Sequence, residues 1–296
     1  MANENLVSII IPSRNEIFLG KTVQDLLAKA SGEIEIIVVL EGYWPTPPLE
    51  EDNRLIIIHR GEAMGMRNAI NAAAAIARGK YLLKCDAHCM FDMGFDKKLA
   101  ADCEDNWIVI PRRKKLDAEN WCIDEYKKRD VDYQFLTCPM TNNDGYTMHG
   151  QIWPERDRAR RNDPKFDIDD NMSFQGSCWF MTKDHYDQRL HGMHEEGYGT
   201  FCQEAQELGN KTWLGGGRVV VNKKTWYAHL HKGKKYGRGY FQNMKELVAG
   251  NIWSAHHWMN NEEPGMVYKL EWLIDRFWPV PSWPEDWKKR INESVR

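Results

Sequence analysis

Apolar runs and segments of helical periodicity alternate over the first 110 residues of the chain. The runs are short, nearly continuous and rich in β-branched residues, as expected of strands that are buried on both faces of a parallel sheet. They lie at Leu6–Pro12, Ile34–Leu40, Leu55–His59 and Tyr81–Leu83. Between them, residues 19–30 have apolar positions at helical spacing, and the Ala-rich residues 65–77 form a second predicted helix. This alternation predicts a doubly wound α/β fold.

The pattern changes after a helix predicted at Met93–Cys103 and a strand predicted at Trp107–Ile110. Residues 111–170 are polar and charged without clear periodicity, which predicts a loop-rich insertion. Beyond the insertion, strands are predicted at 173–181 and 218–221, the latter followed by Thr225–His231, and helices are predicted at 183–190 and 201–213. From residue 240 the chain is helical and then rich in Trp and Pro, which predicts a tail that buries its indoles against the rest.

A length of 296 residues allows one large α/β domain with an appendage. We expect the domain to span residues 1–240 and the helical, Trp-rich extension to span 241–296. Within the domain, we expect a first half over 1–110, the insertion over 111–170 and a second half over 171–240. The chain is long enough to bury a sizeable core without disulfides or a structural metal.

The net charge of −3 gives no general argument for a polyanionic partner, but the charge is unevenly distributed. Residues 208–245 contain nine Lys or Arg and no Asp or Glu, so the rest of the chain carries a net charge of −12. This asymmetry predicts a phosphate-bearing ligand. The Gly and Lys residues of His231–Gly239 suggest a mobile basic loop that closes over a pyrophosphate, with a solvated basic edge as the alternative.

The seven cysteines show no paired CxxC pattern, which is typical of reduced thiols in a cytoplasmic protein. Cys85 and Cys89 leave a thiolate zinc site as an alternative, but they lack a second Cys pair at the required spacing. The N-terminus lacks a basic segment followed by an apolar core, and no apolar run reaches the length of a membrane span. We therefore expect a cytoplasmic protein without a transmembrane segment.

The strand that begins at Tyr81 leads into Asp86-Ala87-His88. Side chains two residues apart on extended backbone point to the same side, so the carboxylate and the imidazole share one face. At the carboxyl end of a parallel strand, this face borders the crevice where such sheets bind ligands. A hard oxygen and a borderline nitrogen could hold a divalent cation there. The alternative is that Asp86 caps the following turn and His88 is a partly buried surface residue.

Several segments together resemble a GT-A nucleotide-sugar transferase, and their order and spacing are similar to glycosyltransferase family 2. The Asp-x-His form is closer to the polypeptide N-acetylgalactosaminyltransferases, and the short, signal-free build resembles phage-type family 2 enzymes. The segments are Val7–Glu16, the strand ending near Glu41, Gly65–Asn68, Asp86–His88, Gly176 with Trp179, Gly199–Gly216 around Glu204, and Tyr227–His229. A dehydrogenase is disfavoured, because no GxGxxG motif follows the first strand.

The resemblance implies which residues would hold a metal ion, contact the transferred sugar and bind the donor. Asp86, His88 and His229 would hold Mn²⁺ or Mg²⁺ as a Lewis acid on the leaving diphosphate, with His231 as an alternative to His229. Glu204, beside Asp86 at the catalytic centre, would contact the transferred sugar or deprotonate the acceptor. The implied donor-binding residues are Pro12, Arg14, Glu16, Glu41, Arg67, Asp86, Ala87, Gly176, Trp179, Lys232, Lys235 and Arg238.

The implied function is metal-dependent transfer from a nucleotide-diphosphate sugar, with a UDP-sugar as the expected donor, to an acceptor hydroxyl. In this scheme residues 1–110 bind the nucleotide, and residues 171–240 bind the metal and the acceptor. Glu41-Gly42 stands where the family has paired Asp, so uracil preference stays open, as do the sugar and the retaining or inverting outcome.

The acceptor is the least determined part of this interpretation. A hydroxymethylated base in DNA is one candidate, because basic clusters at 112–115, 156–161 and 232–238 could track a phosphate backbone. A phage-encoded enzyme of this kind would act in the host cytoplasm. The alternatives are a glycan or protein hydroxyl, a nucleotidyltransferase on the same kind of fold, and a non-catalytic sugar-binding module.

Overall fold

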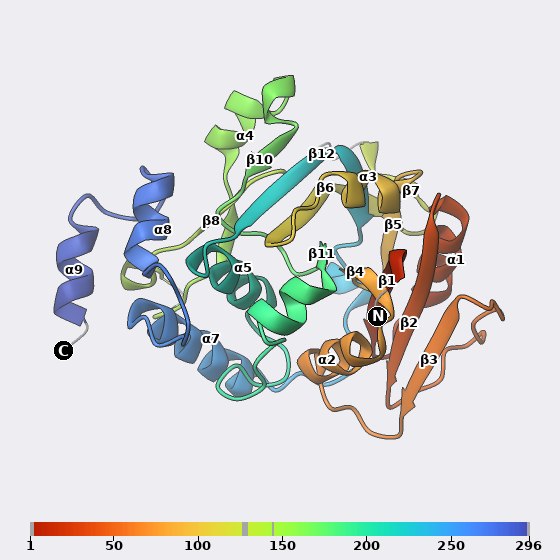
Figure 1. The fold of residues 1–296 in the computed structure, drawn as a ribbon. Helices are drawn as coiled ribbons and strands as arrows, with labels where there is room; N and C mark the ends of the chain where they lie inside the picture. Colours follow the sequence, from red (N-terminus) through yellow and green to blue (C-terminus); the bar gives the residue numbers. More distant parts are fainter. Residues whose placement is uncertain (1–2, 126–129, 144, 295–296) are drawn as a thin grey trace.

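The computed structural model describes residues 3–125, 130–143 and 145–294. Most of the strands join one ten-stranded sheet (Figure 1). Its strands are β1 (Asn3–Ser13), β2 (Glu33–Glu41), β3 (Leu55–Arg60), β4 (Gly79–Cys85), β5 (Cys89–Phe91), β6 (Trp107–Asp117), β7 (Cys122–Ile123), β10 (Ile168–Asp170), β11 (Cys178–Thr182) and β12 (Arg218–His229). A separate two-stranded sheet joins β8 (Gln134–Leu136) and β9 (Gly150–Ile152).

The main sheet has the order β10-β12-β6-β11-β4-β1-β2-β3, with β5 paired to β12 and β7 paired to β6. The pairs β1–β2, β1–β4, β2–β3 and β6–β12 are parallel, whereas β11 runs antiparallel to both of its neighbours. The predicted α/β fold with a mostly parallel central sheet is therefore confirmed. Because its parallel strands end on the same edge, their polar terminal residues gather there.

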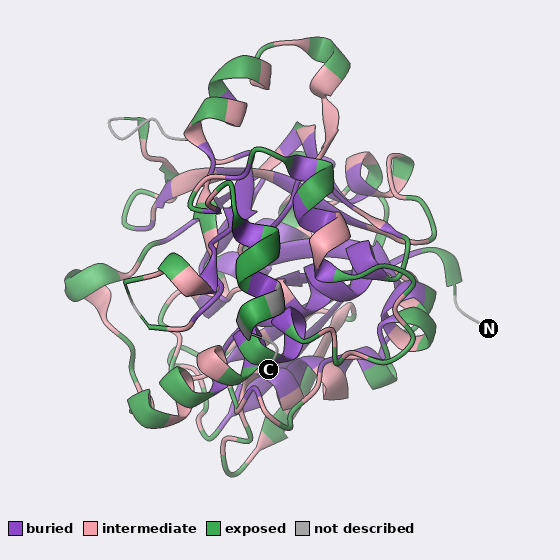
Figure 2. Cartoon of the chain, turned by 90° about the vertical axis from the view of Figure 1, so that its left-hand side faces the viewer, coloured by how far each residue is buried: buried purple, intermediate pink, exposed green. Residues whose placement is uncertain are grey.

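Helices cover both faces of the sheet because successive side chains of a strand point to opposite sides. Ile9 and Ile11 of β1 share a hydrophobic cluster with α1 (Leu19–Lys29) and α3 (Phe95–Ala101). Ile10 faces the other way, into a cluster with α2 (Met66–Ile76) and α5 (Glu204–Leu214). Figure 2 shows the result, with buried residues concentrated in the strands and exposed residues on the outer helices.

The C-terminal residues pack on the second of these faces. The helices α7 (Met244–Met259), α8 (Leu270–Phe277) and α9 (Trp287–Ser294) lie together at the left of Figure 1. Their buried indoles at Trp258 and Trp287 belong to the same hydrophobic cluster as α2 and α5. Within the described ranges, no helix combines the length and apolar character that a bilayer span needs.

The insertion and the strands beside it differ from the sequence prediction. β6 continues to Asp117, because Arg112–Lys115 pairs in parallel register with Trp226–His229 of β12. The strand expected at 218–221 continues to His229 for the same reason. Residues 111–170 also contain β7, β8, β9, β10 and α4 (Pro154–Arg160), so they are less loop-rich than expected. Backbone pairing of polar residues leaves no hydrophobic pattern, which is why the sequence does not show these elements.

On the second half of the sheet, two element boundaries also shift. β11 begins only at Cys178, so Gly176 lies in the loop before it rather than in a strand. The helix predicted from residue 201 begins at Glu204, after Gln203 in a left-handed conformation with φ 60°. Residues 185–189 form one turn of π-helix within the predicted helix at 183–190.

Candidate active site

A cavity of about 780 Å³ opens where the parallel strands end. Pro12, Ser13, Arg14 and Glu16 reach it from the end of β1 and the following loop, and Glu41 reaches it from the end of β2. Asp86-Ala87-His88 after β4 and His229 at the end of β12 complete the strand-derived wall. This is the position where ligands bind to open α/β sheets.

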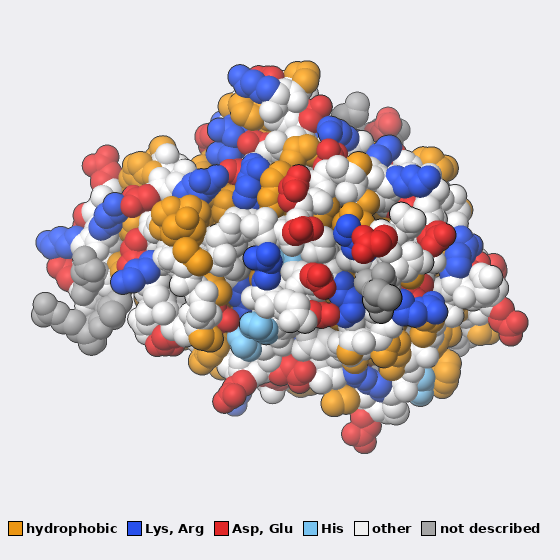
Figure 3. Space-filling model, in the orientation of Figure 1, with side chains coloured by type: hydrophobic (Ala, Val, Ile, Leu, Met, Phe, Trp, Pro, Cys, Tyr) orange, Lys and Arg blue, Asp and Glu red, His pale blue; other side chains and the backbone are white. Residues whose placement is uncertain are grey.

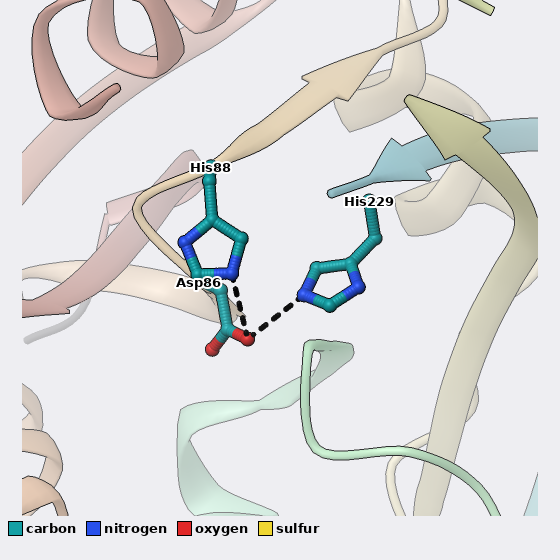
Figure 4. A group of neighbouring side chains, drawn as sticks. All are labelled: Asp86, His88 and His229. Carbon is teal, nitrogen blue, oxygen red and sulfur yellow. Dashed lines mark hydrogen bonds and ion pairs between the residues drawn. The ribbon is translucent and has the colours of Figure 1, made fainter. Parts of the chain in front are cut away.

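Asp86, His88 and His229 meet in this cavity (Figure 4). Asp86 Oδ2 lies 3.2 Å from His229 Nε2 and 3.8 Å from His88 Nε2. One ligand atom from each residue lies within 4.8 Å of the others, and among the described residues this is the one such group of His, Cys, Asp or Glu side chains. A single carboxylate oxygen and two imidazole nitrogens facing one point could hold a divalent metal ion. Neither Cys85 nor Cys89 belongs to the group.

The charge state of the group also suits a cation. Burial lowers the pKa of His229 to about 3, so its imidazole is neutral and keeps a lone pair at neutral pH. Burial alone would raise the pKa of Asp86, but the nearby Lys84 ammonium and the two imidazoles lower it well below its ordinary value. The Asp86 side chain is 28% exposed, so a ligand in the cavity has access to its carboxylate.

Lys84 lies directly behind this group and is completely buried. Its Nζ donates to Asp86 Oδ1 at 2.9 Å, to Glu204 Oε2 at 3.1 Å and to the Gly176 carbonyl at 2.6 Å. Burial would lower the pKa of Lys84, but the two carboxylates raise it above its ordinary value, so the ammonium is charged. Lys84 therefore orients the Asp86 carboxylate and leaves Oδ2 to face the imidazoles.

Glu204, the expected sugar contact or base, is held in this network and does not line the cavity. Its Oε1 accepts from Trp179 Nε1 at 2.7 Å, and its Oε2 accepts from Lys84. Burial raises the pKa of Glu204 above its ordinary value. Trp179 is fully buried and Gly176 packs over Glu204, where a Cβ would come within 2.5 Å of Oε2. These three residues support the site from behind and do not face a donor.

Arg67, which the sequence resemblance implies as a donor-binding residue, is also away from the cavity. Its side chain has no exposed area and forms an ion pair with Glu207. Its guanidinium donates to the carbonyls of Cys202, at 2.6 Å, and His194, at 2.7 Å. The structure therefore gives Arg67 an internal role, in which it holds the segment that precedes α5.

Glu41 lies at the cavity wall, but both of its oxygens are engaged. Oε1 accepts from Arg60 at 2.7 Å, and Oε2 accepts from the backbone N–H groups of Met64 and Gly65 at 2.6 and 2.8 Å. These contacts fix the start of α2 against the end of β2. Arg14 lines the cavity with its guanidinium 4.7 Å from the centre of the Tyr240 ring.

The basic loop contributes some of its predicted residues and not others. Lys232 and Arg238 line the cavity, and Lys232 forms an ion pair with Glu16. Lys235 points elsewhere, since it pairs with the exposed Glu119 and is absent from the cavity wall. The short helix α6 (Gly233–Tyr236) lies within this loop. His231 also lines the cavity but does not belong to the group formed by Asp86, His88 and His229.

The other two basic clusters are largely neutralised by acidic neighbours. Arg112 donates to both oxygens of Asp132 at 2.8 Å, and Lys115 pairs with Asp124 at the same distance. Arg160 contacts Asp169 at 2.8 Å, and Arg161 pairs with Asp157. On the face shown in Figure 3, basic and acidic side chains are accordingly interspersed. These clusters do not form the continuous basic track that the sequence suggested.

The sequence analysis missed a second set of cavity residues, which comes from the start of the C-terminal extension and from the segment before α5. They are Tyr198, Thr200, Phe201, Cys202, Tyr240, Phe241, Gln242, Asn243, Glu246 and Leu247. Thr200, Phe201 and Cys202 lie in the segment Gly199–Gly216 noted above, whereas the residues from Tyr240 onward carry no motif, so only tertiary contacts identify them. Lys84 was also missed, although a charged residue inside the apolar run of β4 is a signal that could have drawn attention to it.

Solved structures that superpose on this chain include GalNAc-T7 and TarS. GalNAc-T7, in a crystal structure with UDP, GalNAc and Mn²⁺, superposes with a TM-score of 0.64 at 15% identity, over 99% of this chain and 55% of GalNAc-T7. TarS from S. aureus, in complex with UDP-GlcNAc, gives a TM-score of 0.49 at 14% identity, over 81% of this chain and 63% of that chain. The chain thus spans about half the length of GalNAc-T7, and the likeness supports the GT-A fold.

No curated protein sequence matches this chain closely enough to be reported as a relative. The model of the family described as glycosyl transferase family 2 matches residues 8–188, which is more than half of the chain. That match covers β1 to β11, including the strand that ends at Asp86 and its loop. The chain belongs to glycosyltransferase family 2.

Proposed function

We propose that this protein transfers a sugar from a nucleotide-diphosphate sugar, with UDP as the nucleotide, to an acceptor hydroxyl in a metal-dependent reaction. The observation that carries the proposal is the convergence of Asp86, His88 and His229 in a cavity at the carboxyl ends of the strands. Membership of family 2 supports the reaction class. The likeness of the fold to GalNAc-T7, whose crystal structure contains UDP and Mn²⁺, supports the donor and the ion. Neither finding favours the nucleotidyltransferase alternative.

In this proposal Asp86, His88 and His229 hold Mn²⁺, with Mg²⁺ as the alternative. When bound, such an ion would supply Lewis-acid stabilisation of the charge that develops on the leaving diphosphate. Asp86 presents Oδ2 because Lys84 engages its other oxygen. Glu204 completes this support as the second carboxylate on the buried ammonium, so we assign it a positioning role rather than that of a base.

The remaining cavity residues divide into a nucleotide end and a diphosphate end. Pro12 and Glu41 shape the wall at the ends of β1 and β2, where we place the base and the ribose. The cationic side chains of Arg14, Lys232 and Arg238 lie along the same cavity and are suited to the diphosphate. We retain the expected division into a domain over 1–240 and an extension over 241–296, although the start of the extension contributes to the cavity.

A hydroxymethylated base in DNA remains our first candidate acceptor. The residues at the rim of the cavity are what supports this choice. Phe241 lines the cavity and is 85% exposed, which makes it suited to stack on a displaced base. Lys234 and Arg238 form no ion pair with any described residue, whereas Lys232 pairs with Glu16 and Lys235 pairs with Glu119. A glycan or protein hydroxyl is the alternative, favoured by the neutralised clusters around Arg112 and Arg160.

The donor is tested by thermal unfolding with a panel of nucleotide diphosphates and nucleotide sugars, each with Mn²⁺ and with EDTA. A ligand that binds only the folded state raises the melting temperature by mass action. We expect a shift with uridine compounds that requires Mn²⁺ and disappears in Asp86→Asn. If no nucleotide shifts the melting temperature in either condition, the transferase proposal fails.

The acceptor is tested by binding of a duplex oligonucleotide that contains hydroxymethylated bases, at 50 and 200 mM salt. If the phosphate backbone is contacted, affinity falls steeply as salt rises, by about tenfold or more for a few contacts. A Phe241→Ala variant should lose affinity for this duplex while keeping the nucleotide-dependent thermal shift. Transfer to a neutral glycan with no dependence on salt would instead favour the alternative acceptor.

A further inference from the structure

Glu16 connects the metal-binding group to the basic loop. It lies in the loop after β1, and its side chain is only 9% exposed. Its Oε2 lies 3.2 Å from His88 Nδ1, and its Oε1 accepts from Lys232. The residues that engage its two oxygens come from the β4–β5 loop and from the segment after β12, which are far apart in the sequence.

The contact with Glu16 determines which nitrogen of His88 is free. A carboxylate only accepts hydrogen bonds, so His88 Nδ1 carries the hydrogen in this contact. In the neutral imidazole the lone pair then lies on Nε2, which is the nitrogen that faces Asp86 Oδ2. A carboxylate behind a metal-binding histidine fixes the tautomer and the orientation of the ring in this way.

His88 needs this support more than His229 does. His229 is the last residue of β12, and its backbone pairs with Cys89 of β5 and Lys115 of β6. Its own Nδ1 has no hydrogen-bond partner among the described residues, so the strand rather than a side chain sets its position. His88 lies between β4 and β5, outside any strand. A side-chain contact is therefore the means by which the imidazole of His88 is oriented.

We propose that Glu16 is a positioning residue that holds His88 in its metal-binding tautomer and anchors the basic loop, through Lys232, to the same point. The inference rests on the proposed function only in requiring that a divalent cation binds. It revises the expected role of Glu16, from contact with the nucleotide to control of the metal site. Because one carboxylate contacts both partners, loss of Glu16 should disturb the metal ligand and the basic loop together.

The test is the dissociation constant of Mn²⁺ without nucleotide, measured by electron paramagnetic resonance. Loss of a carboxylate behind a metal ligand costs about 10- to 100-fold in metal affinity. We expect Glu16→Ala to weaken Mn²⁺ binding by that factor. Glu16→Gln should keep the affinity to within less than about tenfold, because its amide oxygen still accepts from Nδ1. Glu16→Asp keeps the charge but is too short to reach His88, so it should resemble Glu16→Ala.

Two controls separate this role from general stability. Lys232→Met removes the loop contact alone and should leave Mn²⁺ binding without nucleotide unchanged while weakening nucleotide binding. Glu35→Gln alters another buried acid, which binds Ser8 and Arg78 and should affect melting but not metal affinity. Wild-type affinity in both Glu16→Ala and Glu16→Asp would overturn the inference. If the wild-type protein itself does not bind Mn²⁺, the metal-dependent function fails as well.

Discussion

Two groups of charged side chains lie close to one another in this protein but have opposite surroundings. The cavity group faces the open space at the ends of the strands, and the buried group lies between α2, α5 and the C-terminal extension. The cavity group consists of Glu16, Asp86, His88 and His229, and the buried group consists of Arg67, His194, Glu207, Lys211, His257 and Glu263. Both contain His and acidic residues, so residue type alone does not distinguish a binding site from an internal network.

In the buried group every acid has several partners. Glu207 binds Arg67 and also Lys211, at 2.7 Å. Glu263 lies 2.8 Å from His257 and 3.2 Å from His194, and it is 3.8 Å from Lys211. These contacts neutralise the charges within the protein and tie the extension to the sheet-covering helices. Buried charges require such partners, so the group is complete without a ligand.

In the cavity group, the charges are less completely paired within the protein. Asp86 is the only acid among the three candidate ligands, and Lys84 already engages one of its oxygens. The other oxygen faces two imidazoles across 3.2 and 3.8 Å, and the side chain is partly exposed. The comparison therefore indicates that accessible, incompletely neutralised ligands mark the site, whereas charges that pair with one another inside the protein stabilise the fold.

The largest expected effect comes from breaking the buried group. Arg67→Met leaves Glu207 with one fewer cationic partner in a site without solvent, which should lower the free energy of unfolding by about 3–5 kcal/mol. Urea denaturation measures this change. Mn²⁺ binding by the folded protein should persist, because Asp86, His88 and His229 do not contact Arg67. Arg158→Met is the matched control, since Arg158 is 74% exposed and its loss should cost less than about 0.5 kcal/mol.

The second-largest effect is expected from Asp86→Asn, a substitution in the cavity group. Losing the charged ligand should lower the rate of sugar transfer by about 10²–10³-fold, or about 2.7–4 kcal/mol of transition-state stabilisation. The release of UDP from the donor provides the measurement. The loss of stability should be smaller than in Arg67→Met, because the Asp86 side chain is partly exposed and Lys84 keeps Glu204 and the Gly176 carbonyl as partners. If Asp86→Asn unfolds the protein as severely as Arg67→Met, the distinction between the two groups is wrong.

A third effect is the pH dependence of the buried group. Hydrogen bonds from His194 and His257 outweigh burial and lower the pKa of Glu263 from 4.5 to about 2. The stability from this group is therefore fully present above pH 4.5 and is lost as the pH falls toward 2, by about 2–3 kcal/mol. Denaturation curves between pH 5 and 3 should show this loss, and Glu263→Gln should reduce it. A Glu285→Gln control, at an exposed position, should leave the curve unchanged.

The smallest effect concerns the rim of the cavity. The double substitution Lys234→Ala and Arg238→Ala should leave stability within about 0.5 kcal/mol, because neither side chain has an acidic partner among the described residues. It should nevertheless weaken binding of a phosphate-bearing acceptor and reduce the dependence of that binding on salt. The same double substitution at Lys114 and Arg160, which are ion-paired, serves as the comparison. Equal losses in both variants would mean that the rim has no special part in acceptor binding.

The sequence predicts the first half of the fold well, because its physical signal is strong there. β1 and β2 are buried on both faces and read as continuous apolar runs, and α2 is rich in Ala. The extension of β6 to Asp117 is not predictable in this way, because residues 112–115 are basic and their strand comes from pairing with β12. Local pattern therefore identifies elements that bury apolar surface, and misses those held by backbone contacts between polar residues.

The candidate site shows the same difference between features that the sequence predicts and features that it does not. Asp86, His88 and His229 were named from sequence resemblance, and the structure brings the three side chains together. Arg67 is predicted to bind the donor and instead forms an internal ion pair, because a position in a sequence motif does not reveal the direction of its side chain. The contribution of Tyr240–Leu247 was missed because only the tertiary fold brings the start of the extension to the cavity. The sequence therefore does not reveal the direction in which a charged side chain points or the residues with which it pairs.

The central claim is that Asp86, His88 and His229 form a cation site that couples to the diphosphate of the donor. Calorimetric titration of UDP into the wild-type protein, with Mn²⁺ and again with EDTA, tests it most directly. We predict that Mn²⁺ strengthens UDP binding by about tenfold or more, which corresponds to about 1.4 kcal/mol. Asp86→Asn should bind UDP with the weak affinity seen in EDTA, whatever the metal concentration. Equal UDP affinity with and without Mn²⁺ in the wild-type protein would contradict the claim.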